Sequence, residues 1–136
     1  QIRLTVLLLE SKWTARNINM NIDFGEYTIN ANEEMMKQVW INLLDNAIKF
    51  SPEGEEISIR ISNKNEHIYV SISGKGPHIE DEEINKIFRK FYQSDSSHST
   101  EGTGIGLALV SRIIELHKGR IEVNSDKNIN TFTVIL

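Results

Sequence analysis

Hydrophobic residues recur at helical spacing in three stretches of the chain. These stretches cover residues 1–15, 32–50 and 104–118, and each is long enough for several helical turns. A shorter helix with an acidic start is predicted from Glu80 to Phe88. The pattern therefore predicts three principal helices and one minor helix.

Residues at the ends of these helices support the boundaries. Asn32 is a suitable N-cap, and Ser51-Pro52 ends the second helix because the residue before a proline disfavours the helical conformation. Gly119 is expected as the C′ residue of the third helix, with His117 as a favourable cation in the last turn.

Alternation of apolar and polar residues predicts strands between the helices. It is clearest at 57–61 and 68–72, and it returns near 121–123 and 132–134. Residues 18–29 are expected to form a hairpin or a pair of short strands. Alternation gives a sheet one buried face and one wet face. We therefore predict an α+β fold, a two-layer α/β sandwich in which three helices cover one face of a mixed, mostly antiparallel sheet of six to seven strands.

Length, charge and composition narrow the class of protein. The chain has 136 residues, of which 39% are hydrophobic, and this suits one globular domain. We expect residues 1–17 to be the end of a preceding helix or linker and residues 18–136 to form the domain. The net charge of −4 argues against a duplex nucleic-acid binder and against a membrane-surface protein. The absence of cysteine excludes a disulfide framework and a thiolate metal site.

A polar stripe on the second predicted helix is the first candidate for chemistry. Asn42, Asn46 and Lys49 follow one another at intervals of four and three residues, which places them on one side of a helix. Asparagine is a poor helix former, so this stripe needs a reason. It is either a solvated face or a site where amide oxygens meet a hard cation and a lysine meets phosphate.

A glycine-rich turn before the third helix is the second candidate. Gly102, Gly104 and Gly106 lead into that helix, where exposed backbone N–H groups and the helix dipole favour phosphate. The alternative is a flexible hinge with a glycine N-cap. The turn does not fit a P-loop, because no Lys-Ser/Thr pair follows. It fits a dinucleotide-binding fingerprint poorly, because Leu107 replaces the third small residue and such a module needs a parallel sheet.

Taken in order along the chain, these motifs resemble one family. The stretch Asn42–Ser51 is similar to its Asn box, Phe88, Phe91 and Tyr92 to its Phe box, and Gly102–Leu107 to its second glycine box. The family is the catalytic, ATP-binding domain of bacterial sensor histidine kinases, in the GHKL group with type II topoisomerase and heat-shock chaperone ATPases. The resemblance covers nearly the whole chain from about residue 18. It implies the Bergerat fold with an ATP lid at residues 89–103.

The resemblance implies an ATP site that gathers residues from all of these motifs. Asn46, with Asn42 beside it, would hold Mg²⁺ against the phosphates, and Lys49 would pair with phosphate. Phe50 would help to wall the adenine pocket, and Thr131 would lie at its floor. The implied ATP-binding residues are Asn42, Asn46, Lys49, Phe50, Gly76, Ile79, Tyr92, Gly102, Thr103, Gly104, Ile105, Gly106, Leu107 and Thr131.

One motif of the family is altered in this chain. The first glycine box normally reads Asp-x-Gly-x-Gly, whereas the corresponding residues here run from Gly74 to His78 and keep only Gly76. The missing aspartate is, in the family, the acceptor for the adenine amino group. Losing a charged hydrogen-bond partner in a buried pocket costs about 1.5–3 kcal/mol. His78 would add strain if its φ is positive, and its side chain could obstruct the pocket. Both changes predict weakened ATP binding.

The resemblance also implies partners and a location. The domain would donate the γ-phosphate of ATP to a histidine on a separate dimerisation domain, and a response regulator would follow. None of the four histidines lies in a phosphoacceptor pattern, so the fragment holds no certain catalytic residue and is not expected to autophosphorylate. It would be the cytoplasmic domain of a kinase anchored in the bacterial cell membrane, with no membrane or nucleic-acid contact of its own.

Two interpretations of the altered box stay open. One is a kinase domain deliberately altered at this box, so that nucleotide binding is disabled or re-tuned. The other is a naturally degenerate, non-catalytic regulatory module that acts through protein–protein contacts. The intact Asn box, lid and second glycine box favour the first, because a site that is no longer under selection would be expected to change more evenly.

Overall fold

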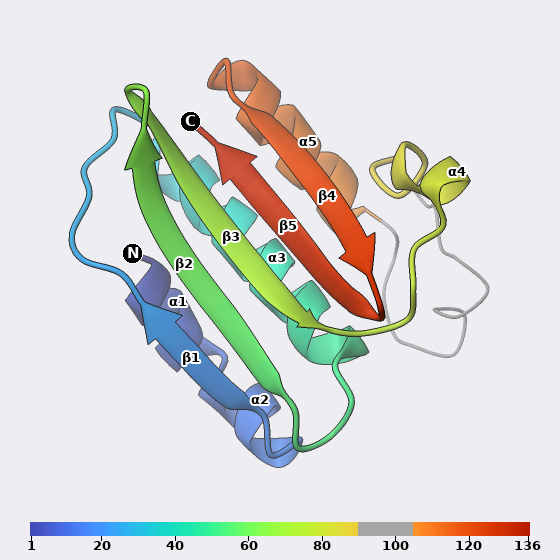
Figure 1. The fold of residues 1–136 in the computed structure, drawn as a ribbon. Coiled ribbons are helices and arrows are strands. Elements are labelled where there is room, and N and C mark those ends of the chain that lie inside the picture. Colours follow the sequence, from blue (N-terminus) through green and yellow to red (C-terminus); the bar gives the residue numbers. More distant parts are fainter. Residues whose placement is uncertain (90–104) are drawn as a thin grey trace.

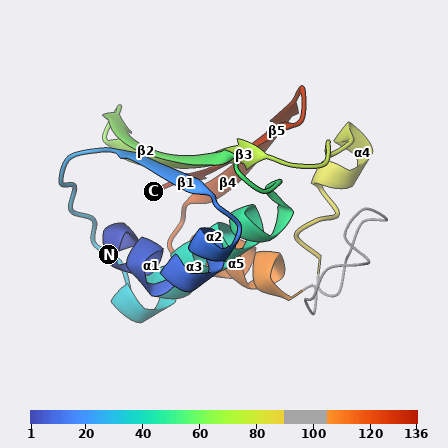
Figure 2. The same ribbon diagram turned by 90° about the horizontal axis from the view of Figure 1, so that it is seen from below.

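The computed structural model describes residues 1–89 and 105–136, which form one sheet with helices on one side (Figure 1 and Figure 2). The elements in chain order are α1 (Ile2–Leu8), α2 (Glu10–Ala15), β1 (Asn19–Asp23), α3 (Glu33–Phe50), β2 (Glu56–Lys64), β3 (His67–Lys75), α4 (Asp81–Ile84), α5 (Gly106–Leu116), β4 (Arg120–Asp126) and β5 (Ile129–Ile135). Figure 2 shows α1, α2, α3 and α5 together beneath the sheet, with α4 beside one end. The predicted two-layer α+β architecture is confirmed.

The sheet has five strands in the order β1-β2-β3-β5-β4. β1 runs parallel to β2, and the other neighbours are antiparallel. The parallel pair follows from its connection, because α3 carries the chain back between β1 and β2. The hairpin or strand pair expected in residues 18–29 is a wrong prediction, since β1 is the one strand there and Tyr27 and Ile29 are exposed. The strand count in the described chain is therefore below the six to seven predicted.

Alternation along the strands gives the two faces that the sequence predicted. Side chains toward the helices are buried and apolar, and they include Ile57, Ile59, Val70, Ile72, Phe132 and Val134. Burying each of these side chains contributes about 1.5–3 kcal/mol relative to leaving it exposed. On the open face, hydroxyl groups pair across strands, Ser71 with Thr133 at 3.0 Å and Ser73 with Thr131 at 2.8 Å. The sheet therefore has a helix-covered face and a polar, solvent-facing one.

The long helix α3 lies against the covered face of the sheet. Oδ1 of Asn32 accepts a hydrogen bond from the backbone N–H of Met35 at 2.9 Å, which confirms the predicted N-cap. The helix ends at Phe50, and Ser51 is already extended with ψ of 133° before Pro52. Its buried residues are Met36, Val39, Trp40, Leu43, Leu44 and Ile48. The polar stripe lies outside this buried set.

The first predicted helix is interrupted at Leu9, which separates α1 from α2. Leu9 is buried, and so are Ile2 and Val6 on α1 and Ile18 after α2. The core is therefore continuous across the domain boundary expected at residue 18, which stays a prediction. In residues 1–89 and 105–136, none of the helices combines the length and the apolar character needed to cross a membrane.

The C-terminal end of α5 differs from the prediction. Lys118, and not Gly119, adopts the left-handed conformation, with φ of 59°. The N–H groups of Lys118 and Gly119 donate to the carbonyls of Glu115 and Ile114 at 2.9 and 3.0 Å, which is a Schellman motif with Lys118 at C′. Gly119 is needed for space, because a β-carbon there would overlap the carbonyl oxygen of Ile135.

His117 connects the end of α5 to the start of α3. Its Nδ1 lies 2.8 Å from the carbonyl oxygen of Ile113, and its Nε2 accepts from the backbone N–H of Asn32 at 3.0 Å. Since Nε2 accepts a hydrogen bond, the imidazole is neutral in this arrangement and carries its proton on Nδ1. The expected helix-end cation is therefore corrected to a neutral ring that links two helices.

Candidate functional site

The polar stripe of α3 faces the start of α5. An ideal β-carbon on Gly106 would lie 2.7 Å from Oδ1 of Asn42, closer than real β-carbons come to another heavy atom. Nδ2 of Asn42 donates to the carbonyl oxygen of Gln38 at 2.7 Å, which holds the amide with Oδ1 toward α5. The structure therefore brings the first Asn of the stripe against the last glycine of the glycine-rich turn.

Asn46 and Lys49 continue the stripe toward the C-terminal end of α3, and like Asn42 they are half-buried. From Asn42 to Phe50 the helix rises about 12 Å. The first backbone N–H groups of α5 have no acceptor inside that helix and carry the positive end of its dipole. Amide oxygens, an ammonium group and a helix N-terminus are groups that bind Mg²⁺ and phosphate.

The residues present fit a magnesium ion that is held jointly with phosphate. Across the described ranges 1–89 and 105–136, no three His, Asp or Glu side chains converge as metal ligands. Mg²⁺ in nucleotide sites is commonly held by one or two protein oxygens, water and the substrate phosphates. The oxygens of Asn46 and Asn42 suit this kind of site, and their role as ligands stays a prediction.

The loop after β3 packs against the other end of α3. A β-carbon on Gly76 would lie 3.1 Å from Nδ2 of Asn130 and 3.4 Å from the carbonyl oxygen of Phe50. The backbone N–H of Gly76 donates to the carbonyl oxygen of Asn128 at 2.9 Å. Glycine at this position therefore lets the loop pass between α3 and β5 without displacing either.

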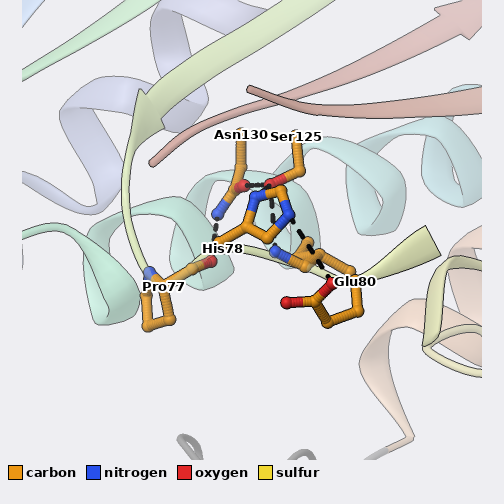
Figure 3. A network of polar contacts seen from close by, with 6 residues as sticks. Pro77, His78, Glu80, Ser125 and Asn130 are labelled. Carbon is orange, nitrogen blue, oxygen red and sulfur yellow. Dashed lines mark hydrogen bonds and ion pairs between the residues drawn. The ribbon is translucent and has the colours of Figure 1, made fainter. Parts of the chain in front are cut away.

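Ser125 on β4 connects the same loop to the β4–β5 hairpin (Figure 3). Its Oγ accepts from the backbone N–H of Ile79 at 2.9 Å and lies 3.0 Å from Nδ1 of His78. The Ser125 hydroxyl also donates to Oδ1 of Asn130 at 2.6 Å. Asn130 in turn donates from Nδ2 to the carbonyl oxygen of Pro77 at 3.0 Å. The loop is thus held by side chains from both strands of the hairpin.

The two altered positions are accommodated without backbone strain. Neither Gly74 nor His78 has a positive φ. The strain expected at His78 is therefore absent, and its ring is turned toward Ser125 (Figure 3). A β-carbon on Gly74 would lie 3.3 Å from Cγ1 of Ile57, so a larger residue there requires Ile57 to move by a few tenths of an ångström.

Thr131 is separated from the other predicted site residues. Its hydroxyl pairs with Ser73 on the open face of the sheet. Phe132 is buried on the covered face, so strand alternation places Asn130, and not Thr131, on the covered side, opposite Gly74. The expectation for Thr131 is corrected accordingly. The sequence could have indicated that Asn130 lies on the covered face, because it stands two residues before Phe132. The contacts of Ser125 could not be predicted from a local pattern, because they join segments that are distant in the chain.

The remaining predicted residues fall into two groups. Ile79 and Leu107 are partly buried and pack against the core, whereas Ile105 is exposed. Those that lie outside the described residues are Tyr92, Gly102, Thr103 and Gly104, together with Phe91 and the expected lid from Lys90 onward. For these positions the site assignment stays a prediction.

Displaced pKa values occur on the sheet, outside the candidate site. Hydrogen bonds from Asn21 and then from Ser58 lower the pKa of the Glu56 carboxyl on β2. A hydrogen bond to Glu122 raises the pKa of the Arg120 guanidinium, at the opposite end of β4 from Ser125. The polar side chains of the candidate site are the amides of Asn42, Asn46 and Asn130, the Ser125 hydroxyl, Lys49 and His78.

Comparison with known proteins gives a family match and curated relatives. The model of the family described as "Histidine kinase-, DNA gyrase B-, and HSP90-like ATPase" matches residues 31–136. The adaptive-response sensory kinase SasA of Nostoc sp. (strain PCC 7120) is 42% identical over 113 residues, which cover 82% of this chain and 28% of SasA. The sensor histidine kinase CusS of Escherichia coli (strain K12) is 36% identical over 104 residues, which cover 75% of this chain and 22% of CusS. The chain spans between 18% and 32% of the length of the first curated relatives.

Solved structures share the fold. The nucleotide-free catalytic domain of the histidine kinase ThkA is 31% identical with a TM-score of 0.86, and the match covers 99% of this chain and 90% of that one. ThkA in complex with the response regulator protein TrrA is 26% identical with a TM-score of 0.79, covering 99% of this chain and 38% of that one. The sheet and its helix layer are therefore the architecture of a solved catalytic domain.

Proposed function

The chain belongs to the family of histidine kinase-, DNA gyrase B- and HSP90-like ATPases, and we propose that it is the ATP-binding catalytic domain of a bacterial sensor histidine kinase. The kinase names of its relatives and the fold that it shares with a kinase catalytic domain support this proposal. The domain binds Mg-ATP and offers the γ-phosphate to a histidine on a separate dimerisation domain. Positioning and charge neutralisation supply most of the catalysis in such a transfer.

The contact between Gly106 and Asn42 is the observation that carries the proposal. It places a helix N-terminus, which favours anions, beside amide oxygens that suit a hard cation. Asn46 and Asn42 would hold the metal, and Lys49 would pair with phosphate. Bound Mg²⁺ would neutralise part of the phosphate charge, while the backbone N–H groups of α5 orient the phosphate oxygens.

The base side of the site is formed by the C-terminal end of α3 and the loop after β3. Phe50, Gly76 and Ile79 supply its walls, and Gly74 leaves it without the carboxylate that the family uses. Loss of that partner costs about 1.5–3 kcal/mol, roughly ten- to a hundredfold in affinity. Since His78 adds no backbone strain and is turned toward Ser125, we assign the weakened binding chiefly to Gly74.

Titration calorimetry with Mg-ATP tests this function. Wild type is expected to bind weakly and only with Mg²⁺, and Gly74→Asp is expected to tighten binding by roughly ten- to a hundredfold. His78→Gly alone should give no gain, and the joint reversion should bind no more tightly than Gly74→Asp. Ser73→Asp is the matched control, because it adds the same carboxylate to the open face of the same strand. If the joint reversion binds no nucleotide, the assignment of this box is wrong.

A non-catalytic regulatory module is the second candidate function. The missing carboxylate at Gly74 favours it, since a module that acts through protein contacts has no use for an adenine acceptor. This candidate predicts no heat from Mg-ATP in wild type or in the joint reversion. The same calorimetric series therefore distinguishes the two functions.

The partners of the whole protein are part of the proposal. Because the chain spans at most 32% of the first curated relatives, the dimerisation domain with its acceptor histidine is assigned to the rest of a longer kinase. The complex of ThkA with TrrA supports a response regulator as the next partner. We place this domain in the cytoplasm, as part of a kinase anchored in the cell membrane. Transfer of labelled phosphate from ATP to a separately supplied dimerisation domain tests the assignment.

A further inference from the structure

We propose that Ser125 is the positioning residue for the base-side wall of the nucleotide site, and that His78 acts through it. The proposal rests on the proposed function, because the wall in question is the loop formed by residues 76–79. Ser125 lies on β4, whereas this loop follows β3. Its hydroxyl therefore connects two segments that are distant in the chain (Figure 3).

The hydrogen-bond geometry determines where the protons of this network lie. Nδ2 of Asn130 donates to the carbonyl oxygen of Pro77, so Oδ1 of the same amide can only accept. The single hydroxyl proton of Ser125 is therefore directed to Oδ1 of Asn130 at 2.6 Å. Oγ is left to accept from the N–H of Ile79 at 2.9 Å, and the 3.0 Å contact with His78 is a hydrogen bond only if Nδ1 carries a proton.

The hydrogen bond to Ser125 therefore requires a proton on Nδ1 of His78. An ion pair with the Glu80 carboxylate, 4.0 Å from Nε2, requires a proton on Nε2 as well. The glycine of the family's motif has no side chain to make the bond to Ser125. The histidine at this position therefore adds a link between the loop and the hairpin.

Attachment of the loop 76–79 to the hairpin positions two residues of the base-side wall, Ile79 and Gly76. Ile79 is held through its backbone N–H, and its side chain packs against the core. Gly76 is kept in the narrow space between Asn130 and Phe50. Removing the Ser125 hydroxyl eliminates three contacts at once and releases this loop from the hairpin. The contact between α3 and α5 does not involve Ser125, so the phosphate side should be unaffected.

Paired calorimetric affinities for Mg-ATP and for Mg-tripolyphosphate test the proposal. Ser125→Ala is expected to weaken Mg-ATP binding about tenfold and to leave tripolyphosphate binding unchanged, since tripolyphosphate has no base. Ser125→Thr keeps the hydroxyl and should restore Mg-ATP binding. Ser73→Ala is the matched control, because it removes a hydroxyl contact with Thr131 on the open face, and it should bind both ligands as wild type does.

Nitrogen NMR of the His78 ring gives an independent readout. Wild type should show Nδ1 protonated and hydrogen-bonded, and Ser125→Ala should lose that hydrogen bond. Equal Mg-ATP affinity in wild type and Ser125→Ala, an equal loss for both ligands, or a His78 Nδ1 without a proton in wild type would each overturn the positioning role. Failure of wild type and of Gly74→Asp to bind either ligand would instead overturn the proposed function, and this inference with it.

Discussion

A β-carbon on Gly106 would lie 2.7 Å from Oδ1 of Asn42, so the first residue of α5 and the polar stripe of α3 are in direct contact. At the other end of α3, the carbonyl oxygen of Phe50 lies close to Gly76 in the loop after β3. One helix therefore connects both sides of the proposed nucleotide site. The phosphate side has its amides, lysine and helix N-terminus, while the base side lacks a carboxylate at Gly74.

Gly106→Ala is expected to weaken Mg-ATP binding by about tenfold or more, because its β-carbon must displace the Asn42 amide. The group that must move is a side-chain amide and not backbone, so the variant is expected to keep its fold and most of its stability. Gly25→Ala is the control, since nothing lies within 4 Å of its β-carbon. Calorimetry measures the change in Mg-ATP affinity, and thermal melting measures the change in stability. Unchanged affinity in Gly106→Ala would show that the contact between Gly106 and Asn42 has no role in nucleotide binding.

Asn46→Ala is expected to reduce the magnesium dependence of ATP binding. The substitution deletes one of the two amide oxygens that we assign to the metal and leaves Asn42, so the gain in affinity that Mg²⁺ gives over a chelator should become smaller. The surface of β2 offers a control in Asn63→Ala, an exposed position that should keep the wild-type ratio. An Asn46 variant that keeps the wild-type magnesium dependence would remove this residue from the ligand set.

His117→Ala is expected to lower the free energy of unfolding by about 1 kcal/mol, the usual net contribution of one hydrogen bond. The reason is the loss of the acceptor for the Asn32 N–H, which connects α5 to α3. Urea denaturation measures the change. The exposed strand residue His67 supplies the comparison, and equal stability of His117→Ala and His67→Ala would show that the link contributes nothing.

The lowered pKa of Glu56 gives a pH prediction with a defined sign. Hydrogen bonds from Asn21 and Ser58 favour the carboxylate in the folded state, so its contribution to stability is complete above the unfolded pKa of about 4.3 and is lost as the pH falls through the lower folded pKa. Carbon NMR should find the Glu56 midpoint below that of an unfolded glutamate. In Asn21→Ala the midpoint should rise, and an unchanged midpoint would assign the shift to another cause.

The sequence predicted the long helix α3 and the two motifs that meet beside it, because these depend on local patterns; their role in phosphate binding stays a prediction. The N-cap at Asn32 and the end of α3 at Phe50 follow from residue preferences, and the spacing of Asn42, Asn46 and Lys49 follows from helical geometry. The contact between Asn42 and Gly106 confirms that the two motifs meet. The contact between the two motifs depends on the tertiary structure, whereas each motif could be recognised in the sequence alone.

The base side could not be predicted in the same way. Counting from Phe132 would have placed Asn130 on the covered face in place of Thr131, because alternation fixes the side of each strand residue. Ser125 gave no local signal, since its partners at Ile79 and His78 belong to another segment. The predicted strain at His78 failed because the backbone there does not need glycine.

The strand pattern was misleading at the N-terminal side for a related reason. Alternation at Tyr27 and Ile29 resembled a second strand of a hairpin, yet in the described part of the chain both residues lie outside the strands and are exposed. β1 instead pairs in parallel with β2, a partner that follows α3 in the chain. Periodicity shows which residues alternate in polarity. Which strands pair depends on where the connecting segments, here α3, bring the next strand.

The ratio of the Mg-ATP and Mg-tripolyphosphate affinities tests the central claim most directly. If the phosphate side is complete and the base side lacks its acceptor, wild type should bind the two ligands with affinities within about tenfold of each other. Gly74→Asp should tighten ATP alone, by roughly ten- to a hundredfold. An ATP affinity in wild type far above that for tripolyphosphate, with no change in Gly74→Asp, would contradict the account.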